Sequence, residues 1–280
     1  MSTQRLALAI STYHRASMLA AIIRAVAPTC RELGIPIHIS DNASTDDTPN
    51  VCRELSEQYE HVYFTRHEQE CSIDENMVSA LDGSSASYTW WSGDDDYISP
   101  STLVVAQAWL ERGSPDGILF PGASVPSGFV LTGDPVVEQL QRVGCNFEPT
   151  SFLRLASAAA VFAGRYYNIP IGTLIVPTAR IKKANPGKYY GTHHAHSGAF
   201  YEMLSATDRD EGGVDVWVAD APGSVSLTPQ DPDRKTWAHL KEDIARRALP
   251  EWLTRLPPTY DPYQAEAREF HRHIFRDILT

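Results

Sequence analysis

Three consecutive aspartates, Asp94, Asp95 and Asp96, directly follow the apolar segment 88–91. Adjacent carboxylates repel one another, and in a folded protein a bound cation or basic partners usually offset that repulsion. Mg²⁺ suits such a site because it takes few carboxylates and completes its shell with water and substrate phosphate oxygens. The alternative is a solvated acidic turn in front of a helix beginning at Pro100. The position of the triplet at a strand end favours the cation site.

A second polar stretch, residues 40–48, follows another apolar run. Turn formation and helix capping explain the segment 45–47, but they do not explain Asp41. An aspartate at a strand end can accept hydrogen bonds from a nucleobase N–H or a ribose hydroxyl. The net charge of −11 argues against a protein that grips nucleic acid through its phosphates. It does not exclude a nucleotide ligand, because a metal ion can supply positive charge locally.

Three imidazoles lie within four residues, at His193, His194 and His196. A neutral imidazole can ligate a metal ion, and a protonated one can pair with phosphate. For His193 and His194 we favour a surface or supporting role. A dedicated zinc site is disfavoured because no Cys or carboxylate lies at the customary spacing nearby.

The elements that position these groups follow from hydrophobic periodicity, which alternates between strand-like and helix-like segments. Strands are predicted at 6–11, 35–40, 62–66 and 88–92, and helices at 16–33, 49–60 and 73–81. This order implies a parallel sheet with helices on both faces. Ligands on such sheets lie beyond the carboxyl ends of the strands. Thr12, Asp41 and Asp94 are therefore expected to share one rim.

The rest of the chain is less regular. We predict helices at 100–112, 151–163, 235–253 and 262–279, strands at 169–176 and 214–219, and short strands and loops over 113–150. Pro28 is expected to kink or split the first helix. The acid excess lies entirely within 1–228, because 229–280 holds as many acidic as basic residues.

The cysteines Cys30, Cys52, Cys71 and Cys145 have no C-x-x-C spacing, which favours reduced thiols in a cytosolic protein. The N-terminal apolar run is too short for a secretory signal, and no stretch approaches the roughly 20 apolar residues of a membrane span. We therefore expect a cytoplasmic protein.

Four stretches in this order and spacing, IS-TYHR, ISDNASTDDT, ENMVSAL and WWSGDDDYISP, resemble family 2 glycosyltransferases of the GT-A fold. The likeness covers residues 6–112 and continues more faintly through IPIGTLIV and GTHHAH. It implies an α/β protein with a Rossmann-like, mostly parallel central sheet flanked by helices. The ISDNAST and GDDD variants are most similar to abequosyltransferase-like members that build O-antigen and other surface polysaccharides.

The resemblance also implies a domain organisation. We expect a catalytic domain at 1–228, with a nucleotide-binding half at about 1–112 and an acceptor-binding half at about 113–228. A C-terminal helical extension at 229–280 would pack on it, on the acceptor side.

The resemblance assigns roles to individual residues. The residues that it implies for binding the nucleotide-diphosphate-sugar donor are Thr12, Tyr13, Arg15, Asp41, Arg66, Asn76 and Asp94. Those implied around Mn²⁺ or Mg²⁺ are Asp94, Asp95, Asp96 and His196. The commonest family form has a carboxylate where this sequence has Gly93. The usual D-x-D spacing is still available here, as Asp94 and Asp96. Alignment to the second aspartate of the family motif instead favours Asp95 as the direct metal ligand. The sequence leaves the choice between these alternatives open.

The implied reaction transfers a sugar from the donor to a hydroxyl of a saccharide or lipid-linked acceptor. If it inverts the anomeric carbon, a carboxylate should deprotonate that hydroxyl. Glu202 is the nearest candidate in the matching region, with Asp208 and Asp210 as others. No Glu-Asp pair occurs there, so a retaining mechanism stays open.

Two other functions compete with this interpretation. One is a non-catalytic carbohydrate-binding protein with a GT-A shell. The other is a sugar nucleotidyltransferase, which is disfavoured because the segment 11–15 has no glycine to cradle phosphate.

The last predicted helix carries Arg268, Arg272 and Arg276 on one stripe. The stripe is either a solvated face with ion pairs or a surface for weak docking to anionic lipid. The second interpretation would place the protein at the inner face of a membrane.

Overall fold

The computed structural model describes residues 4–125, 136–143, 148–164, 169–227, 240 and 242–276. The first elements in chain order are β1 (Leu6–Thr12), α1 (Ala16–Leu33), β2 (Ile37–Asp41), α2 (Thr48–Gln58), β3 (Val62–Arg66), α3 (Ile73–Asp82), β4 (Tyr88–Gly93), β5 (Asp96–Ile98) and α4 (Pro100–Arg112). The middle elements are β6 (Gly117–Leu119), α5 (Val136–Arg142), β7 (Phe152–Leu155), α6 (Ala158–Ala163), β8 (Leu174–Pro177), α7 (Thr178–Lys183), η1 (Pro186–Tyr189), α8 (Ala195–Glu211), β9 (Val216–Ala219) and β10 (Ser224–Ser226). The last are the π-helical turn η2 (Ile244–Ala248), α10 (Leu249–Arg255), η3 (Pro258–Tyr263) and α11 (Gln264–Ile274).

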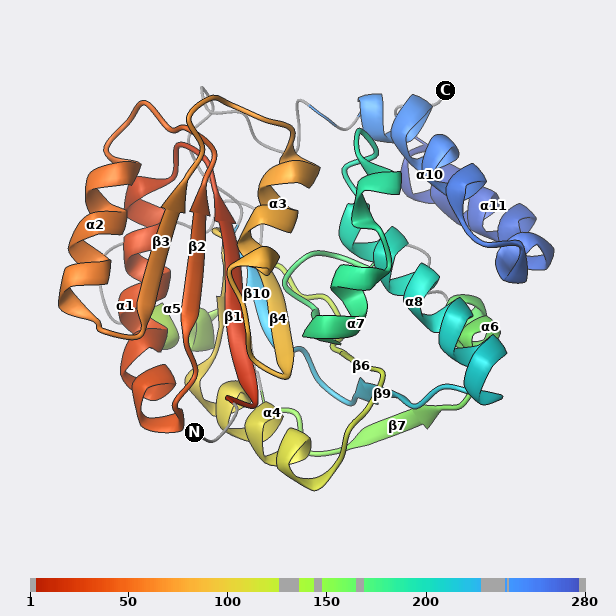
Figure 1. Ribbon diagram of the computed structural model, residues 1–280, viewed down its shortest axis with the longest axis horizontal. Helices are drawn as coiled ribbons and strands as arrows, with labels where there is room; N and C mark the ends of the chain where they lie inside the picture. The colour runs from red at the N-terminus through yellow and green to blue at the C-terminus, as the bar shows by residue number, and fades with distance from the viewer. Residues whose placement is uncertain are drawn as a thin grey trace.

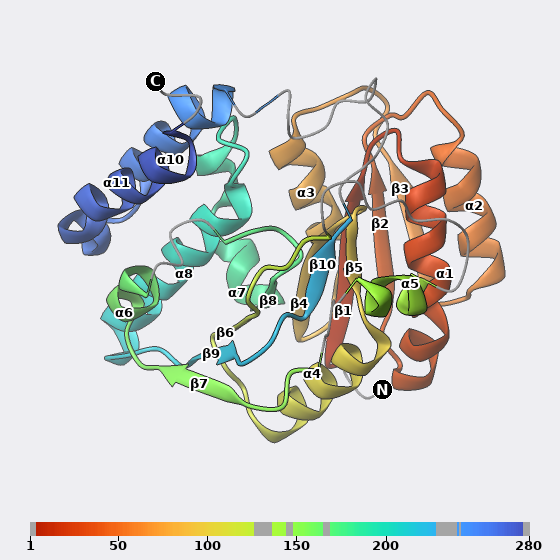
Figure 2. The same cartoon turned by 180° about the vertical axis from the view of Figure 1, so that it is seen from behind.

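The strands form one eight-stranded sheet in the order β3-β2-β1-β4-β8-β6-β9-β7, and β10 pairs with β5 in a small second sheet. The first four strands run parallel, while β8 is antiparallel to both its neighbours and β7 is antiparallel to β9. Helices cover both faces, and α10 and α11 lie on the side of the molecule away from α1 and α2 (Figures 1 and 2). The predicted α/β architecture, with its mostly parallel central sheet flanked by helices, is confirmed.

The central strands bury side chains on both faces, which explains their nearly continuous apolar sequences. Leu8 and Trp90 are in register on β1 and β4 and belong to the core that α1 and α4 cover. Their neighbours Ala9 and Trp91 belong to the core on the α3 and α8 side. Both indole N–H groups are bonded, Trp90 to the carbonyl of Gly172 and Trp91 to that of Met77, each at 2.8 Å. These bonds remove the cost of burying the indole nitrogens.

Local sequence signals set the helices next to these strands. The Ser72 hydroxyl accepts the Glu75 backbone N–H, and the Glu75 carboxylate accepts that of Ser72, which together cap the start of α3. α1 ends at Gly34, whose φ of +67° is the left-handed conformation that favours glycine. α1 continues through Pro28, so the expected split does not occur.

Two sequence-based predictions of secondary structure are wrong. The segment predicted as one helix at 151–163 begins as the edge strand β7 and becomes helical only at α6. Pairing with β9 decides this, because the Phe152 ring stacks on Trp217 at 4.2 Å and Arg154 makes two bonds to Asp215. The predicted strand at 169–176 begins only at Leu174. β5 and β10 are three residues each, too short to produce a periodic signal.

Some predictions concern residues that the structure does not describe. Parts of the predicted helices at 235–253 and 262–279 and of the loop region 113–150 are among them, as is Cys145. Cys30, Cys52 and Cys71 are free thiols. Within the described ranges, no helix has the length and apolar character needed to span a membrane.

Candidate active site

A cavity of about 670 Å³ lies at the carboxyl ends of β1 and β4. This volume is typical of small-molecule sites, and the position is where open α/β sheets bind ligands. Its polar and charged lining residues include Thr12, Tyr13, Arg15, Asn42, Glu70, Asn76, Asp94, Asp95 and His193.

Asp94 is the acidic residue most closely tied to the end of β1. Its Oδ2 accepts the Thr12 hydroxyl at 2.7 Å and the Tyr13 backbone N–H at 3.2 Å. Burial raises the pKa of Asp94 to about 6, while the positive charge of Arg15 acts in the opposite direction. The predicted meeting of Thr12 and Asp94 at one rim is therefore seen in the structure.

Arg15 brings a positive charge against the acidic residues. Its Nη1 lies 3.3 Å from Asp95 Oδ2 and 3.7 Å from Asp94 Oδ1, and only 11% of the Arg15 side chain is exposed. That nitrogen is buried and makes no hydrogen bond among the residues the structure describes. The Arg15 backbone N–H donates to the Thr48 hydroxyl at 3.0 Å, which ties this loop to the start of α2.

The third aspartate of the triplet turns away from the cavity. Asp96 Oδ2 accepts the Gly93 backbone N–H at 3.0 Å, and Asp96 is not among the cavity-lining residues. Gly172 packs so closely that a Cβ there would lie 2.5 Å from Asp96 Cγ. Burial, followed by the charge of Asp95, raises the pKa of Asp96 well above its ordinary value. The cavity thus presents Asp94 and Asp95 as its acidic pair, rather than Asp94 and Asp96.

Asp41 is enclosed where β2 ends. Its carboxylate accepts Arg66 Nε at 3.1 Å and the Ser44 backbone N–H at 3.2 Å, and the residue has no exposed surface. Neither Asp41 nor Arg66 lines the cavity, but the next residue, Asn42, does. Asn42 exchanges hydrogen bonds with the backbone of Cys71, at 2.8 and 2.9 Å. Sequence reasoning did not single out Asn42. Its position next to Asp41, at the end of a strand, is the one signal that could have indicated it.

Asn76 joins two strand ends at the cavity wall. Its Oδ1 accepts the Ser40 hydroxyl at 2.8 Å, and its Nδ2 donates to the Thr12 carbonyl at 3.1 Å. Tyr13 extends from the same loop, and its hydroxyl donates to Glu70 Oε2 at 2.7 Å. That bond raises the pKa of Tyr13 to about 12.

The histidines are distributed differently from the prediction. His196 is buried, with Nε2 2.6 Å from the Ile169 carbonyl and its ring edge-on to Trp91. His194 Nδ1 lies 2.7 Å from the Thr192 carbonyl. Of the three, only His193 lines the cavity. Over the described ranges, no group of three or more His, Cys, Asp or Glu side chains is arranged to hold a metal ion, so the predicted set that includes His196 does not converge.

The comparisons with known proteins found a family match for the segment that contains the ends of β1, β2 and β4. Residues 8–135 match the model of glycosyl transferase family 2. No curated protein sequence matches the chain.

The fold of the whole chain is shared with solved glycosyltransferases. S. aureus TarS is 14% identical with a TM-score of 0.60, and the match covers 95% of this chain but only 44% of that protein. TarS 1–349 in complex with UDP-GlcNAc is 14% identical with a TM-score of 0.60, covering 97% of this chain and 76% of that one. The mannosyltransferase PcManGT from Pyrobaculum calidifontis, in complex with GDP-Man and Mn²⁺, is 15% identical with a TM-score of 0.58, covering 95% and 70%. The predicted GT-A fold is confirmed.

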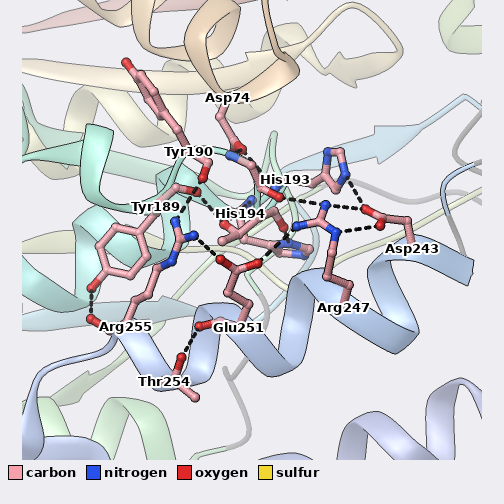
Figure 3. Close-up of polar contacts among 12 residues, drawn as sticks. Asp74, Tyr189, Tyr190, His193, His194, Asp243, Arg247, Glu251, Thr254 and Arg255 are labelled. Atoms are coloured by element: carbon pink, nitrogen blue, oxygen red, sulfur yellow. Dashed lines mark hydrogen bonds and ion pairs between the residues drawn. The ribbon is translucent and has the colours of Figure 1, made fainter.

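A buried carboxylate on α3 anchors the loop that leads into α8. Asp74 accepts three backbone N–H bonds, from Gly191, His193 and Ala195, each at 2.9 Å (Figure 3). Burial raises the pKa of Asp74, and these bonds act against the rise. Sequence reasoning missed this anchor, because an acidic residue in the first turn of a helix normally has a sufficient local explanation.

The other side of the same loop is held by the C-terminal helices. Arg247 donates to the Gly191 carbonyl at 3.0 Å, and Arg255 donates to the carbonyls of Lys188 and Tyr190, both at 2.9 Å (Figure 3). The loop is therefore fixed between α3 and a segment more than fifty residues further along the chain.

The carboxylates considered as catalytic bases lie elsewhere. Glu202 pairs with Lys188, accepts the Tyr189 hydroxyl at 3.1 Å, and lines a second cavity together with Asp210. Asp208 accepts the Ala158 backbone N–H at 3.0 Å. None of the three carboxylates lines the cavity that contains Asp94 and Asp95.

Proposed function

We propose that the chain is a glycosyltransferase that moves a sugar from a nucleotide-diphosphate-sugar to a hydroxyl of a saccharide or lipid-linked acceptor. One observation carries the proposal. In a family 2 domain, a cavity of ligand size at the ends of the parallel strands contains the buried acidic pair Asp94 and Asp95 beside Arg15. The cavity combines negative charge suited to a metal ion with a guanidinium suited to phosphate.

The donor class is supported by the cavity lining and by the relatives. Tyr13 lines the cavity, and its ring stacks on His14 with centroids 4.0 Å and planes 19° apart. An aromatic ring at this position suits stacking on a nucleobase. Thr12, Asn42 and Asn76 line the same cavity. TarS 1–349 is solved with UDP-GlcNAc and PcManGT with GDP-Man, so both relatives take nucleotide-diphosphate-sugars.

A divalent ion fits the acidic pair. Two buried carboxylates face a single guanidinium, and the raised pKa of Asp94 reflects its incompletely compensated burial. Mn²⁺ or Mg²⁺ needs few protein ligands when substrate phosphate supplies the rest, and PcManGT is solved with Mn²⁺. When bound by Asp94 and Asp95, such an ion supplies charge stabilisation to the departing nucleotide diphosphate. Arg15 lies within reach of the same carboxylates and would share that task.

We further propose that residues 1–228 form the catalytic unit, that 229–280 form an extension on the acceptor side, and that the enzyme acts in polysaccharide or O-antigen synthesis. The contacts of Arg247 and Arg255 with the loop before α8 support the extension's role in shaping the cavity wall. The sequence variants at Asp41 and at the aspartate triplet support the polysaccharide assignment.

Thermal unfolding with UDP, GDP, CDP and dTDP, each with and without Mn²⁺, tests the donor site. We expect one nucleotide to raise the unfolding temperature, and to raise it further with Mn²⁺. Release of the nucleotide from its sugar conjugate then distinguishes an enzyme from a carbohydrate-binding protein with the same fold. Stabilisation without any such release would favour the binding protein, and no stabilisation by any of the four would contradict a donor site.

A further inference from the structure

His193 is the histidine that the structure brings to the cavity wall. It lines the cavity together with Asp94, Asp95 and Leu240, and 16% of its side chain is exposed. Its Nε2 lies 3.1 Å from Asp243 Oδ2. An imidazole paired with a carboxylate is an arrangement that can take up a proton during a reaction.

The carboxylate behind His193 is itself held in place. Arg247 donates from Nε to Asp243 Oδ1 at 2.7 Å and from Nη2 to Asp243 Oδ2 at 2.6 Å (Figure 3). A further bond from Arg247, at 3.1 Å, goes to Glu251 one helical turn further on. A two-point contact of this kind fixes the plane of the carboxylate, and so the orientation of the imidazole that it contacts.

The backbone of His193 is constrained as well. Its φ is +59°, which is uncommon for a residue other than glycine. Its N–H donates to Asp74 at 2.9 Å, and the bonds of Gly191 and Ala195 to the same carboxylate hold the flanking residues. Residues other than glycine in such sparsely populated backbone regions cluster at active sites and ligand-binding positions.

The other titratable side chains of the cavity are engaged in ways that suit other tasks. Asp94 and Asp95 face Arg15, and Glu70 accepts the Tyr13 hydroxyl. His193 also lines the cavity, but its imidazole pairs with Asp243, a carboxylate from the C-terminal extension.

We propose that His193 is the general base of sugar transfer and that Asp243 is its positioning residue; this assignment rests on the proposed function. The acceptor oxygen forms a bond to the anomeric carbon as the bond from that carbon to the diphosphate oxygen breaks. The electron pair leaves with the nucleotide diphosphate. The acceptor's hydroxyl proton moves to the ring nitrogen of His193 that does not face Asp243. The resulting imidazolium is stabilised by Asp243 and loses its proton to solvent after the product leaves.

Three charged groups surround His193. Asp243 contacts its ring, Asp74 accepts its backbone N–H, and Arg247 pairs with Asp243 behind it. Loss of Asp243 removes a negative charge next to the ring. The acidic limb of the kcat profile should therefore move to lower pH in D243N.

The test uses the full chain and measures release of UDP from UDP-GlcNAc and of GDP from GDP-Man. His193→Asn and His193→Gly both tolerate the positive φ, so they separate loss of the base from misfolding. We expect both to lower kcat by about 100-fold or more, with unchanged affinity for UDP or GDP in the presence of Mn²⁺. Added imidazole should restore part of the activity of H193G, because it can occupy the vacated space. D243N should lower kcat by about 10-fold or more and shift its pH profile.

Two exposed positions provide matched controls. His273→Asn and Glu242→Gln repeat the same chemical changes outside the cavity and should leave kcat as in the native chain. If H193N and H193G retain more than about one third of native kcat, the base assignment is overturned while the proposed function stands. A native chain that cleaves neither donor and is stabilised by none of UDP, GDP, CDP and dTDP would overturn the assignment together with the donor site. The two failures are therefore distinguishable.

Discussion

Arg15 and Asp95 form a buried ion pair at the wall of the cavity, with Nη1 and Oδ2 3.3 Å apart. Only 11% and 9% of the two side chains are exposed. The pair joins the loop after β1 to the loop after β4, and the same nitrogen lies 3.7 Å from Asp94. Two carboxylates thus share one guanidinium, and this charge imbalance provides the negative charge available to a divalent ion.

Neutralising Asp95, one member of the acidic pair, should abolish metal-dependent donor binding. We expect D95N to lower donor cleavage by about 100-fold or more, because both the proposed ion ligand and the partner of Arg15 are lost. The additional thermal stabilisation by Mn²⁺ over nucleotide alone should also disappear. The exposed Glu60→Gln is the control. Full Mn²⁺ dependence in D95N would show that Asp95 is not a ligand.

Removing Arg15 should destabilise the protein and make it more responsive to metal. R15A leaves two buried carboxylates facing one another, at a cost of about 3–5 kcal/mol in the free energy of unfolding. Mn²⁺ should restore a larger share of that stability than it adds to the native chain. Urea titrations with and without Mn²⁺ measure both quantities, and the exposed Arg53→Ala serves as the control. An equal Mn²⁺ effect in R15A and the native chain would contradict this account.

Asp74→Asn should loosen the loop before α8. One carboxylate now accepts three backbone N–H bonds, and an amide oxygen with an adjacent NH₂ group cannot accept all of them. We expect a loss of about 1–3 kcal/mol in stability and faster amide hydrogen exchange at residues 191–195. Exchange in β1 should not change, and unaltered exchange across the loop would count against the anchor.

The buried His271 predicts a loss of stability in mild acid. Burial, with the charge of Arg268, lowers the pKa of His271 to about 4. Between pH 6.5 and 4 the unfolded chain binds a proton there that the folded chain does not, so stability is full above pH 6.5 and falls as the pH decreases. His271 accounts for about 2 kcal/mol of that loss at pH 5. Denaturant titrations at pH 7.5 and 5 should show a smaller loss in H271Q than in the native chain or in the exposed-site control H273Q.

The arginine stripe of the last helix can be tested on vesicles. Arg272 and Arg276 are exposed, and Ile274 between them is 51% exposed on α11. If this surface contacts anionic lipid, native protein should sediment with phosphatidylserine vesicles and do so less at high salt. The triple change of Arg268, Arg272 and Arg276 to Gln should remove that binding. Equal sedimentation of the variant would exclude the stripe as a docking surface.

The sequence by itself determined the fold class and the order of strands and helices from β1 to β4. The reason is local: strands buried on both faces read as apolar runs, and turn and cap residues mark where they end. It also identified the strand ends that meet, as the bond between Thr12 and Asp94 shows.

Only the tertiary structure decided which side chains face the cavity. Within one turn, Asp95 points inward and Asp96 is held by Gly93 and Gly172. Side-chain direction in an irregular loop depends on such distant packing and has no sequence period. The pairing of His193 with Asp243 joins residues fifty positions apart. Asp74, which holds the same loop, lies 119 positions before His193 in the sequence. Contacts of that separation arise from the packing of whole elements against one another, so no local pattern could predict them.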